Sequence, residues 1–273
     1  MTGSAMRVAA VQINSQPDVA ANLDKMAQQV EQLMAGARPD LIVFPEYSSY
    51  ISSSADLLRA RAEAEGVGPA CAWISSLARR HAVNIHLGSL MEKAEGRFYN
   101  CSLVFDRSGA IIGRYRKMHR FDVTLPDGTQ ILESEMVERG DEVVTVDIDG
   151  IRFGLAICYD LRFGELFRAL ERKGAQVLLI PSAFAQQTGI DHWEVLLRAR
   201  AIETQCYVVA PAQIGSYDQG TRTSFGHTMA IDPWGVVVAQ AGNREGAITV
   251  DIDTHRLAAI RAMLPVGKHH VLK

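Results

Sequence analysis

The sequence LAICYDLRFGEL, residues 155–166, places Cys158 where an apolar run gives way to charged residues. Residues 153–157 are typical of a short buried strand, and apolar positions at Leu166, Phe167 and Leu170 predict a helix over residues 165–172. A thiol at this turn is expected at an exposed strand end, near helix-terminal N–H groups that favour a negative charge. A single cysteine in an apolar run is more often a small core residue, so any function of Cys158 depends on partners elsewhere in the chain.

Composition and charge narrow the class of protein. The chain has 273 residues, of which 48% are hydrophobic and 22% charged, so it can bury a large core. A formal net charge of −3, without a block of like charges, argues against a nucleic-acid partner. Residues 1–6 lack the features of a signal peptide, and no apolar segment is long enough to span a bilayer. We therefore expect a soluble cytoplasmic protein without a membrane partner.

The cysteines and histidines do not indicate a disulfide framework or a metal site. The cysteines are widely scattered, which suits reduced thiols; they are Cys71, Cys101, Cys158 and Cys206. His81 and His86 are five positions apart in a predicted strand and would point to opposite faces. We expect neither a metal nor an organic cofactor.

The pattern of apolar residues predicts strands that alternate with helices. The expected strands cover residues 7–12, 41–44, 82–90, 98–105, 110–115, 143–148, 151–157, 177–180, 206–210, 226–231, 236–239 and 247–252. The expected helices cover residues 19–33, a region from about residue 55 that restarts at Pro69, and residues 165–172, 192–203 and 257–263. Helix pairs between groups of strands favour an α/β fold with two mixed sheets packed face to face and helices outside.

Residues 1–273 are predicted to form one domain, because the chain contains no repeat, low-complexity linker or shift in composition. We expect residues 1–5 to be a flexible start. Residues 265–273 have little hydrophobic pattern and are expected to form an extended tail that lies on a partner subunit. Residues 116–140 are a long polar stretch, and such a segment inside a compact domain is usually functional.

Three predicted strands end at a residue with reactive chemistry. Glu46 follows Phe44-Pro45, Lys117 follows Tyr115-Arg116, and Cys158 follows Ala156-Ile157. Strand ends of one layered fold lie close together, so a carboxylate, an ammonium and a thiol are able to converge. Each residue alone is weak support, because a glutamate after a strand or a lysine beside arginines is usually at the surface.

These motifs, FPEY at residues 44–47, YRKMH at 115–119 and CYDLRF at 158–163, resemble those of the nitrilase superfamily of carbon–nitrogen hydrolases. The resemblance extends from Arg7 to about His269. It implies a four-layer α-β-β-α sandwich that assembles into a homodimer or a higher homo-oligomer. Residues 192–210 are most similar to the branch that hydrolyses deaminated glutathione, and the related ω-amidases remain an alternative.

The resemblance also implies roles for individual residues. Cys158 corresponds to the nucleophile, Glu46 to the general base and Lys117 to the oxyanion stabiliser. Glu133, in the segment Leu132-Glu133-Ser134, corresponds to a second glutamate that orients the site. Two residues depart from the family pattern: Arg120 stands where relatives have an apolar residue, and Gly164 where a proline is common.

The chemistry of these residue types supports an amidase that acts on non-peptide C–N bonds. A thiol with a pKa of about 8.5 is only a few per cent ionised near neutrality, so attack on an amide needs a base and a cation nearby. Glu46 would accept the thiol proton, and Lys117 with the backbone N–H after Cys158 would hold the oxyanion, each donor contributing about 3 kcal/mol. Ammonia or an amine would leave a thioester, which water activated by Glu46 would cleave.

The expected substrate is a small amide with a carboxylate, and deaminated glutathione is favoured. Alternatives are 2-oxo acid amides, nitriles and carbamoyl amines, or a catalytically silent binding module. Peroxide reduction is less favoured, because it usually needs a resolving cysteine.

Candidate substrate-binding residues are Tyr47, Tyr159, Arg162, Phe184 and Thr188. Arg162 is either the anchor of a substrate carboxylate or a structural ion-pair partner of Asp160 or Glu165. Trp193 is assigned to the core of its helix, and Arg200 to ion pairing.

Overall fold

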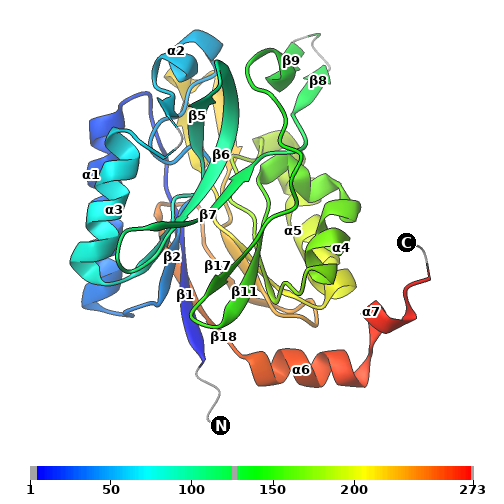
Figure 1. Cartoon of the computed structure of the whole chain (residues 1–273). Coiled ribbons are helices and arrows are strands. Elements are labelled where there is room, and N and C mark those ends of the chain that lie inside the picture. The colour runs from blue at the N-terminus through cyan, green and yellow to red at the C-terminus, as the bar shows by residue number, and fades with distance from the viewer. Residues whose placement is uncertain (1–4, 65, 125–127, 129, 272–273) are drawn as a thin grey trace.

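The computed structural model describes residues 5–64, 66–124, 128 and 130–271 (Figure 1). Residues 1–4 of the expected flexible start and residues 272–273 of the expected tail lie outside the described residues. Within the described part, one sheet has eight strands, with β7 (Ile111–Arg116) paired to β6. The other strands follow the order β18 (Gly246–Ile252), β1 (Met6–Gln12), β2 (Leu41–Val43), β4 (Asn84–His86), β6 (Arg97–Phe105), β5 (Leu90–Ala94) and β3 (Glu63–Ala64).

A second sheet has six strands in the described part, in the order β10 (Thr145–Ile148), β11 (Ile151–Leu155), β12 (Val177–Leu179), β13 (Tyr207–Ala210), β16 (Met229–Ile231) and β17 (Val237–Gln240). Both sheets are mixed. Strands β1, β2 and β4 run parallel, as do β11, β12 and β13, whereas β18, β10 and β16 pair antiparallel with their neighbours.

The two sheets pack face to face with helices on the outer faces. Val8 and Ala10 of β1 share a buried cluster with Phe153 and Leu155 of β11, so this cluster lies between the sheets. Because successive side chains of a strand point to opposite faces, Ala9 joins a different cluster, beneath the helices. These helices are α1 (Val19–Ala35) and α3 (Pro69–His81). The other sheet is covered by α4 (Gly164–Arg172) and α5 (Gln186–Thr204) (Figure 1). The expected four-layer α-β-β-α sandwich is confirmed.

The expected strand over residues 82–90 was wrong. It is two strands, β4 and β5, and His81 closes α3 instead of lying in a strand. Gly88 between them has a φ of +83°, and a Cβ there would lie 1.9 Å from the carbonyl oxygen of Pro45. The chain therefore turns at Gly88 against the segment that carries Glu46.

Other differences arise where partners distant in sequence decide the structure. Helix α5 begins at Gln186, before the expected residue 192, and Gly189 there packs against the ring of Phe225. Two hairpins were not expected: β8 (Asp122–Thr124) with β9 (Gln130–Leu132), and β14 (Ile214–Tyr217) with β15 (Arg222–Phe225). The expected extended tail is also wrong in part, because α7 (Val266–His269) follows α6 (Thr254–Met263) as a short helix.

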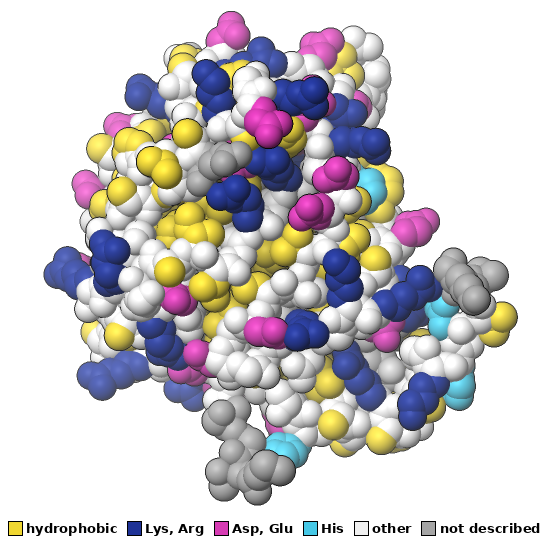
Figure 2. All heavy atoms as spheres, viewed as in Figure 1, with side chains coloured by type: hydrophobic (Ala, Val, Ile, Leu, Met, Phe, Trp, Pro, Cys, Tyr) yellow, Lys and Arg dark blue, Asp and Glu magenta, His cyan; other side chains and the backbone are white. Residues whose placement is uncertain are grey.

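Basic and acidic side chains are interspersed on the face of the molecule that Figure 2 shows. In the described part of the chain, none of the helices combines the length and apolar content needed to cross a bilayer. The same residues contain no group of three or more His, Cys, Asp or Glu side chains arranged to hold a metal ion.

Replacing Gly88 by alanine is expected to lower the free energy of unfolding by about 4 kcal/mol or more, because the new Cβ would collide with the backbone of Pro45. Gly96→Ala is the matched control, since Gly96 also has a positive φ, +77°, but nothing lies within 4 Å of its Cβ position. Its loss should be about 1–2 kcal/mol, the cost of the left-handed backbone alone. Chemical denaturation of both variants measures the difference, and equal losses would contradict the proposed contact.

Candidate active site

The structure brings the three reactive strand ends together. Glu46 follows β2, Lys117 follows β7, and Cys158 follows β11 at the start of the 3-10 helix η2 (Cys158–Arg162). The Nζ atom of Lys117 lies 3.2 Å from Oε1 of Glu46. All three side chains line one cavity of about 470 Å³. Glu46 and Lys117 are each 3% exposed, whereas Cys158 is only half-buried.

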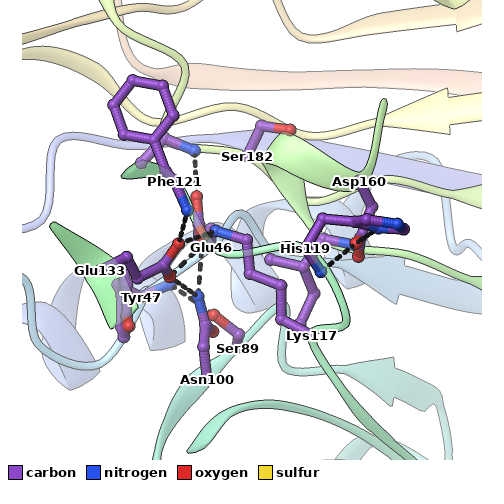
Figure 3. A network of polar contacts seen from close by, with 12 residues as sticks. Glu46, Tyr47, Ser89, Asn100, Lys117, His119, Phe121, Glu133, Asp160 and Ser182 are labelled. Atoms are coloured by element: carbon purple, nitrogen blue, oxygen red, sulfur yellow. Dashed lines mark hydrogen bonds and ion pairs between the residues drawn. The ribbon is translucent and has the colours of Figure 1, made fainter. Parts of the chain in front are cut away.

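Glu133 completes a buried ionic network around Lys117 (Figure 3). Lys117 Nζ donates to Glu133 Oε1 at 3.0 Å and to Oε2 at 2.9 Å, and the amide of Phe121 also donates to Oε2, at 2.6 Å. Burial alone would lower the pKa of Lys117, but the charges of Glu133 and Glu46 outweigh it and raise this pKa well above its ordinary value. The lysine therefore stays a cation although its side chain is buried.

Besides Lys117, two donors orient the carboxylate of Glu46. Asn100 Nδ2 donates to Oε1 at 2.8 Å, and the backbone amide of Ala183 donates to Oε2 at 2.8 Å. Gln213 Nε2 donates to the backbone carbonyl of Glu46 at 2.9 Å. Sequence reasoning missed Asn100 and Gln213. Asn100 carried a usable signal, because asparagine is disfavoured in strands and this one interrupts the run that became β6.

The backbone of Cys158 is held in an unusual conformation. Its φ is +47°, which is uncommon for a residue other than glycine, and its N–H donates to the carbonyl of Pro181 at 3.0 Å. The amide N–H of the next residue, Tyr159, takes part in no hydrogen bond within the described part of the chain. That N–H is therefore free to donate a hydrogen bond to a ligand oxygen.

The thiol of Cys158 is neutral in the resting protein. Burial raises its pKa well above the ordinary value, and the charge of Glu46 raises it further; Lys117 acts in the opposite direction but is outweighed. The sequence-based expectation that Lys117 promotes ionisation has the right sign, but the effect is too small to produce a resting thiolate. Attack by this sulfur therefore requires proton transfer to a base at the same time.

Asp160 joins two of the strand ends that carry the site. Its carboxylate accepts hydrogen bonds from the amide of Ile157 at 2.9 Å, the hydroxyl of Tyr115 at 2.7 Å and the amide of His119 at 3.0 Å. His119 Nδ1 lies 2.7 Å from the same carboxylate, and the His119 ring stacks on Phe163. This role of Asp160 was not predicted.

Arg162 does not form the expected ion pair with Asp160 or Glu165 in the described structure. Its Nη1 lies 3.2 Å from Nδ1 of His192. Its guanidinium lies over the rings of Tyr159 and Phe184, at 5.7 and 5.1 Å from their centroids. Arg162 also lines the cavity, and its role as the anchor of a substrate carboxylate stays a prediction.

All five candidate substrate-binding residues line this cavity: Tyr47, Tyr159, Arg162, Phe184 and Thr188. The hydroxyl of Tyr47 is buried and has no hydrogen-bond partner among the described residues. The sequence did not point to other residues of the lining, which include Arg59, Phe121, Tyr217 and Arg222.

The remaining sequence assignments concern residues outside the cavity. Trp193 is fully buried, and its Nε1 donates to the carbonyl of His227 at 2.8 Å. Arg200 pairs with Glu203 at 2.8 Å, as expected. A Cβ at Gly164 would lie 3.2 Å from Nη1 of Arg200, so this departure from the family pattern leaves room for the ion pair. Arg120 is half-buried and does not belong to the cavity lining of the described residues.

Comparison with known proteins gives consistent matches along the chain. A model of the carbon-nitrogen hydrolase family matches residues 7–262. The deaminated glutathione amidase of Synechocystis sp. is 38% identical over 96% of this chain and 97% of its own length, and the human one is 38% identical over 96% and 81%. The structure of Saccharomyces cerevisiae Nit3, a member of branch 10 of the nitrilase superfamily, is similar with a TM-score of 0.87 and 32% identity over 96% of this chain and 95% of that one.

Iodoacetamide is expected to label Cys158 first, because Cys71, Cys101 and Cys206 are at most 1% exposed. The reagent reacts with the thiolate, and the pKa of Cys158 is raised. Its labelling rate should therefore keep rising with pH beyond the range in which an ordinary thiol, of pKa about 8.5, levels off. Mass spectrometry of the labelled peptides after short exposures measures both effects. Labelling of Cys158 no faster than of Cys206 would contradict this description of the site.

Proposed function

Since this chain belongs to the carbon-nitrogen hydrolase family, we propose that it is an amidase in which Cys158 attacks the carbonyl carbon of a small amide. One observation carries the proposal. Lys117 Nζ bridges the carboxylates of Glu46 and Glu133 in the cavity that Cys158 also lines. A base, a fixed cation and a thiol in one site are what thiol-based amide hydrolysis requires.

The first half of the reaction transfers the acyl group to sulfur. As Sγ of Cys158 bonds to the carbonyl carbon, its proton passes to the carboxylate of Glu46. The carbonyl oxygen becomes an oxyanion, held by Lys117 Nζ and the free amide of Tyr159. Glu46 then gives the proton to the nitrogen, the C–N bond breaks, and ammonia or an amine leaves a thioester on Cys158.

The second half returns the cysteine to its resting form. Glu46 accepts a proton from water as the water oxygen bonds to the thioester carbon. The tetrahedral intermediate then collapses, the C–S bond breaks, and Glu46 returns the proton to sulfur. Because Asn100 and the amide of Ala183 hold the Glu46 carboxylate in both halves, one base serves both steps.

Glu133 acts through Lys117 in this scheme. The proton shuttle leaves Glu46 alternately charged and neutral, so the ammonium needs a second, constant carboxylate partner. Glu133 contacts Nζ with both oxygens, which keeps the lysine charged and fixes its position when Glu46 is protonated.

Deaminated glutathione is the proposed substrate, supported by the names of the relatives from Synechocystis and human and by the exposure of Arg162 to the cavity. The ω-amide of a 2-oxo acid is the main alternative, followed by nitriles and carbamoyl amines. A catalytically silent binding module is disfavoured, because each proposed catalytic position holds a competent side chain in contact with its neighbours. We also propose that the protein assembles as a homo-oligomer and needs no cofactor.

Replacement of Cys158 by alanine should abolish ammonia or amine release, because no other described cysteine lines the cavity. Cys71→Ala is the control, since Cys71 lies on the buried face of α3 and outside the cavity lining. Measurement of kcat/KM for deaminated glutathione, a 2-oxo acid amide, a nitrile and a carbamoyl amine identifies the substrate class. Full activity of the Cys158 variant would refute the mechanism.

Replacement of Tyr47 by phenylalanine should lower kcat/KM about tenfold while leaving Tm unchanged or higher. The Tyr47 hydroxyl is buried without a partner in the free protein, so its loss costs no folding energy but removes a donor for substrate. Tyr115→Phe is the contrasting control, because the Tyr115 hydroxyl donates to Asp160 and its loss should lower stability by about 1–3 kcal/mol. A lower Tm for Tyr47→Phe would indicate a structural role instead.

A further inference from the structure

The cavity is rich in arginine outside the network around Lys117. The charged side chains that line it there are Arg59, Arg162, Arg222 and Glu135. Arg59 is already engaged, because its Nη2 donates to the backbone carbonyls of Glu135 and Met136. Arg162 and Arg222 have no carboxylate partner within the described residues. Two cations that face a ligand cavity without a protein anion are suited to bind anionic groups of the ligand.

Arg222 is built onto a firmly attached hairpin. It begins β15 and pairs with Tyr217 at the end of β14. The far end of β15 is fixed to the cavity wall, because the amide of Phe225 donates to the carbonyl of Phe184 at 2.8 Å. The tip is fixed as well, since Asp218 accepts hydrogen bonds from Ser52, at 3.3 Å, and from the amide of Ser53. The guanidinium therefore projects from a backbone with a defined position relative to the site.

Tyr217 lies within electrostatic range of both Arg222 and two of the reacting groups, Glu46 and Cys158. Burial raises the pKa of Tyr217 to about 12; Arg222 acts to lower this pKa, whereas Glu46 and Cys158 act to raise it. The pKa of Tyr217 thus responds to the charge of Arg222 and to the charges of Glu46 and Cys158. Like Arg222, Tyr217 lines the cavity.

We propose that Arg222 binds a second carboxylate of the substrate, so that with Arg162 it selects small amides that carry two carboxylates. This inference rests on the proposed amidase function. The cavity volume of about 470 Å³ is in the range of sites that enclose a complete small ligand, so it has room for an amide with an anionic group on each arm. The planar guanidinium suits this role, because it pairs with a carboxylate through two parallel N–H donors.

This assignment separates two substrates that the reacting groups alone do not distinguish. An amide of a 2-oxo acid with a single carboxylate would engage Arg162 and leave Arg222 unpaired. Deaminated glutathione carries a further carboxylate on its glycine and would engage both arginines. We therefore expect Arg222 to give the protein a preference for deaminated glutathione over amides with a single carboxylate.

The test is a cycle of two substrates and two proteins. The substrates are deaminated glutathione and its glycinamide analogue, in which the terminal carboxylate is replaced by a neutral amide. Arg222→Gln should lower kcat/KM for deaminated glutathione about tenfold or more, mainly through KM, and change that for the analogue by less than about twofold. Arg222→Lys keeps the charge without the planar fork. Its kcat/KM for deaminated glutathione should therefore lie between that of the unmodified protein and that of Arg222→Gln.

Arg139→Gln is the matched control, because Arg139 is exposed and lies outside the cavity lining. The substitution changes the net charge by the same amount as Arg222→Gln. It should leave both substrates unaffected. Equal losses for both substrates in Arg222→Gln, or no loss for either, would overturn the assignment of Arg222 while the amidase function stands. If Arg222→Gln does not fold, the same comparison with Arg222→Lys decides. Failure of the unmodified protein to hydrolyse either compound would instead overturn the proposed function, and this inference with it.

Discussion

The carboxylate of Asp160 holds the two halves of the site together. It is fully buried and accepts hydrogen bonds from Ile157, Tyr115 and His119. Tyr115 lies in β7 and His119 just after it, whereas Ile157 follows β11 of the other sheet. A buried carboxylate is costly unless donors satisfy it, so these donors cannot separate without leaving a charge unsolvated. Because Ile157 precedes Cys158 and the other donors flank Lys117, this constraint sets how the backbone segments that carry Cys158 and Lys117 lie against each other. The packing of one sheet on the other thus determines the relative positions of the residues of the candidate site.

The ionic network around Lys117 works under a second constraint, which is charge balance. Two carboxylates face one ammonium where solvent is nearly excluded, and the adjacent thiol stays neutral. A separate thiolate would add a further negative charge, which the low polarity of the site opposes. Transfer of the thiol proton to Glu46 leaves the total charge unchanged. The site therefore suits a reaction in which proton transfer and bond formation occur together.

Much of this architecture could be predicted from the sequence, because it depends on local patterns. Short apolar runs, some of them closed by proline, predicted the buried strands. The motifs that follow three of these strands predicted that Glu46, Lys117 and Cys158 lie at strand ends. The role of Asn100 was not predicted, since its partner Glu46 is 54 residues away and meets it only through the order of strands in the sheet. The β14–β15 hairpin was missed for a similar reason: it is held by Phe184 and Ser52 more than by its own apolar pattern. The turn at Gly88 depends on the backbone of Pro45, which no local pattern reveals.

The excess of carboxylates over ammonium groups in this network also affects the end of the reaction. In the proposed hydrolysis, the uncharged amide group of the substrate is converted to a carboxylic acid beside Glu46 and Glu133. Once this product ionises, it is a third carboxylate facing the single ammonium of Lys117. Like charges at this range in a poorly solvated site repel strongly. Glu46 and Glu133, which organise the proposed attack, therefore also lower the affinity of the site for the product. The negative charge that hydrolysis creates favours product release.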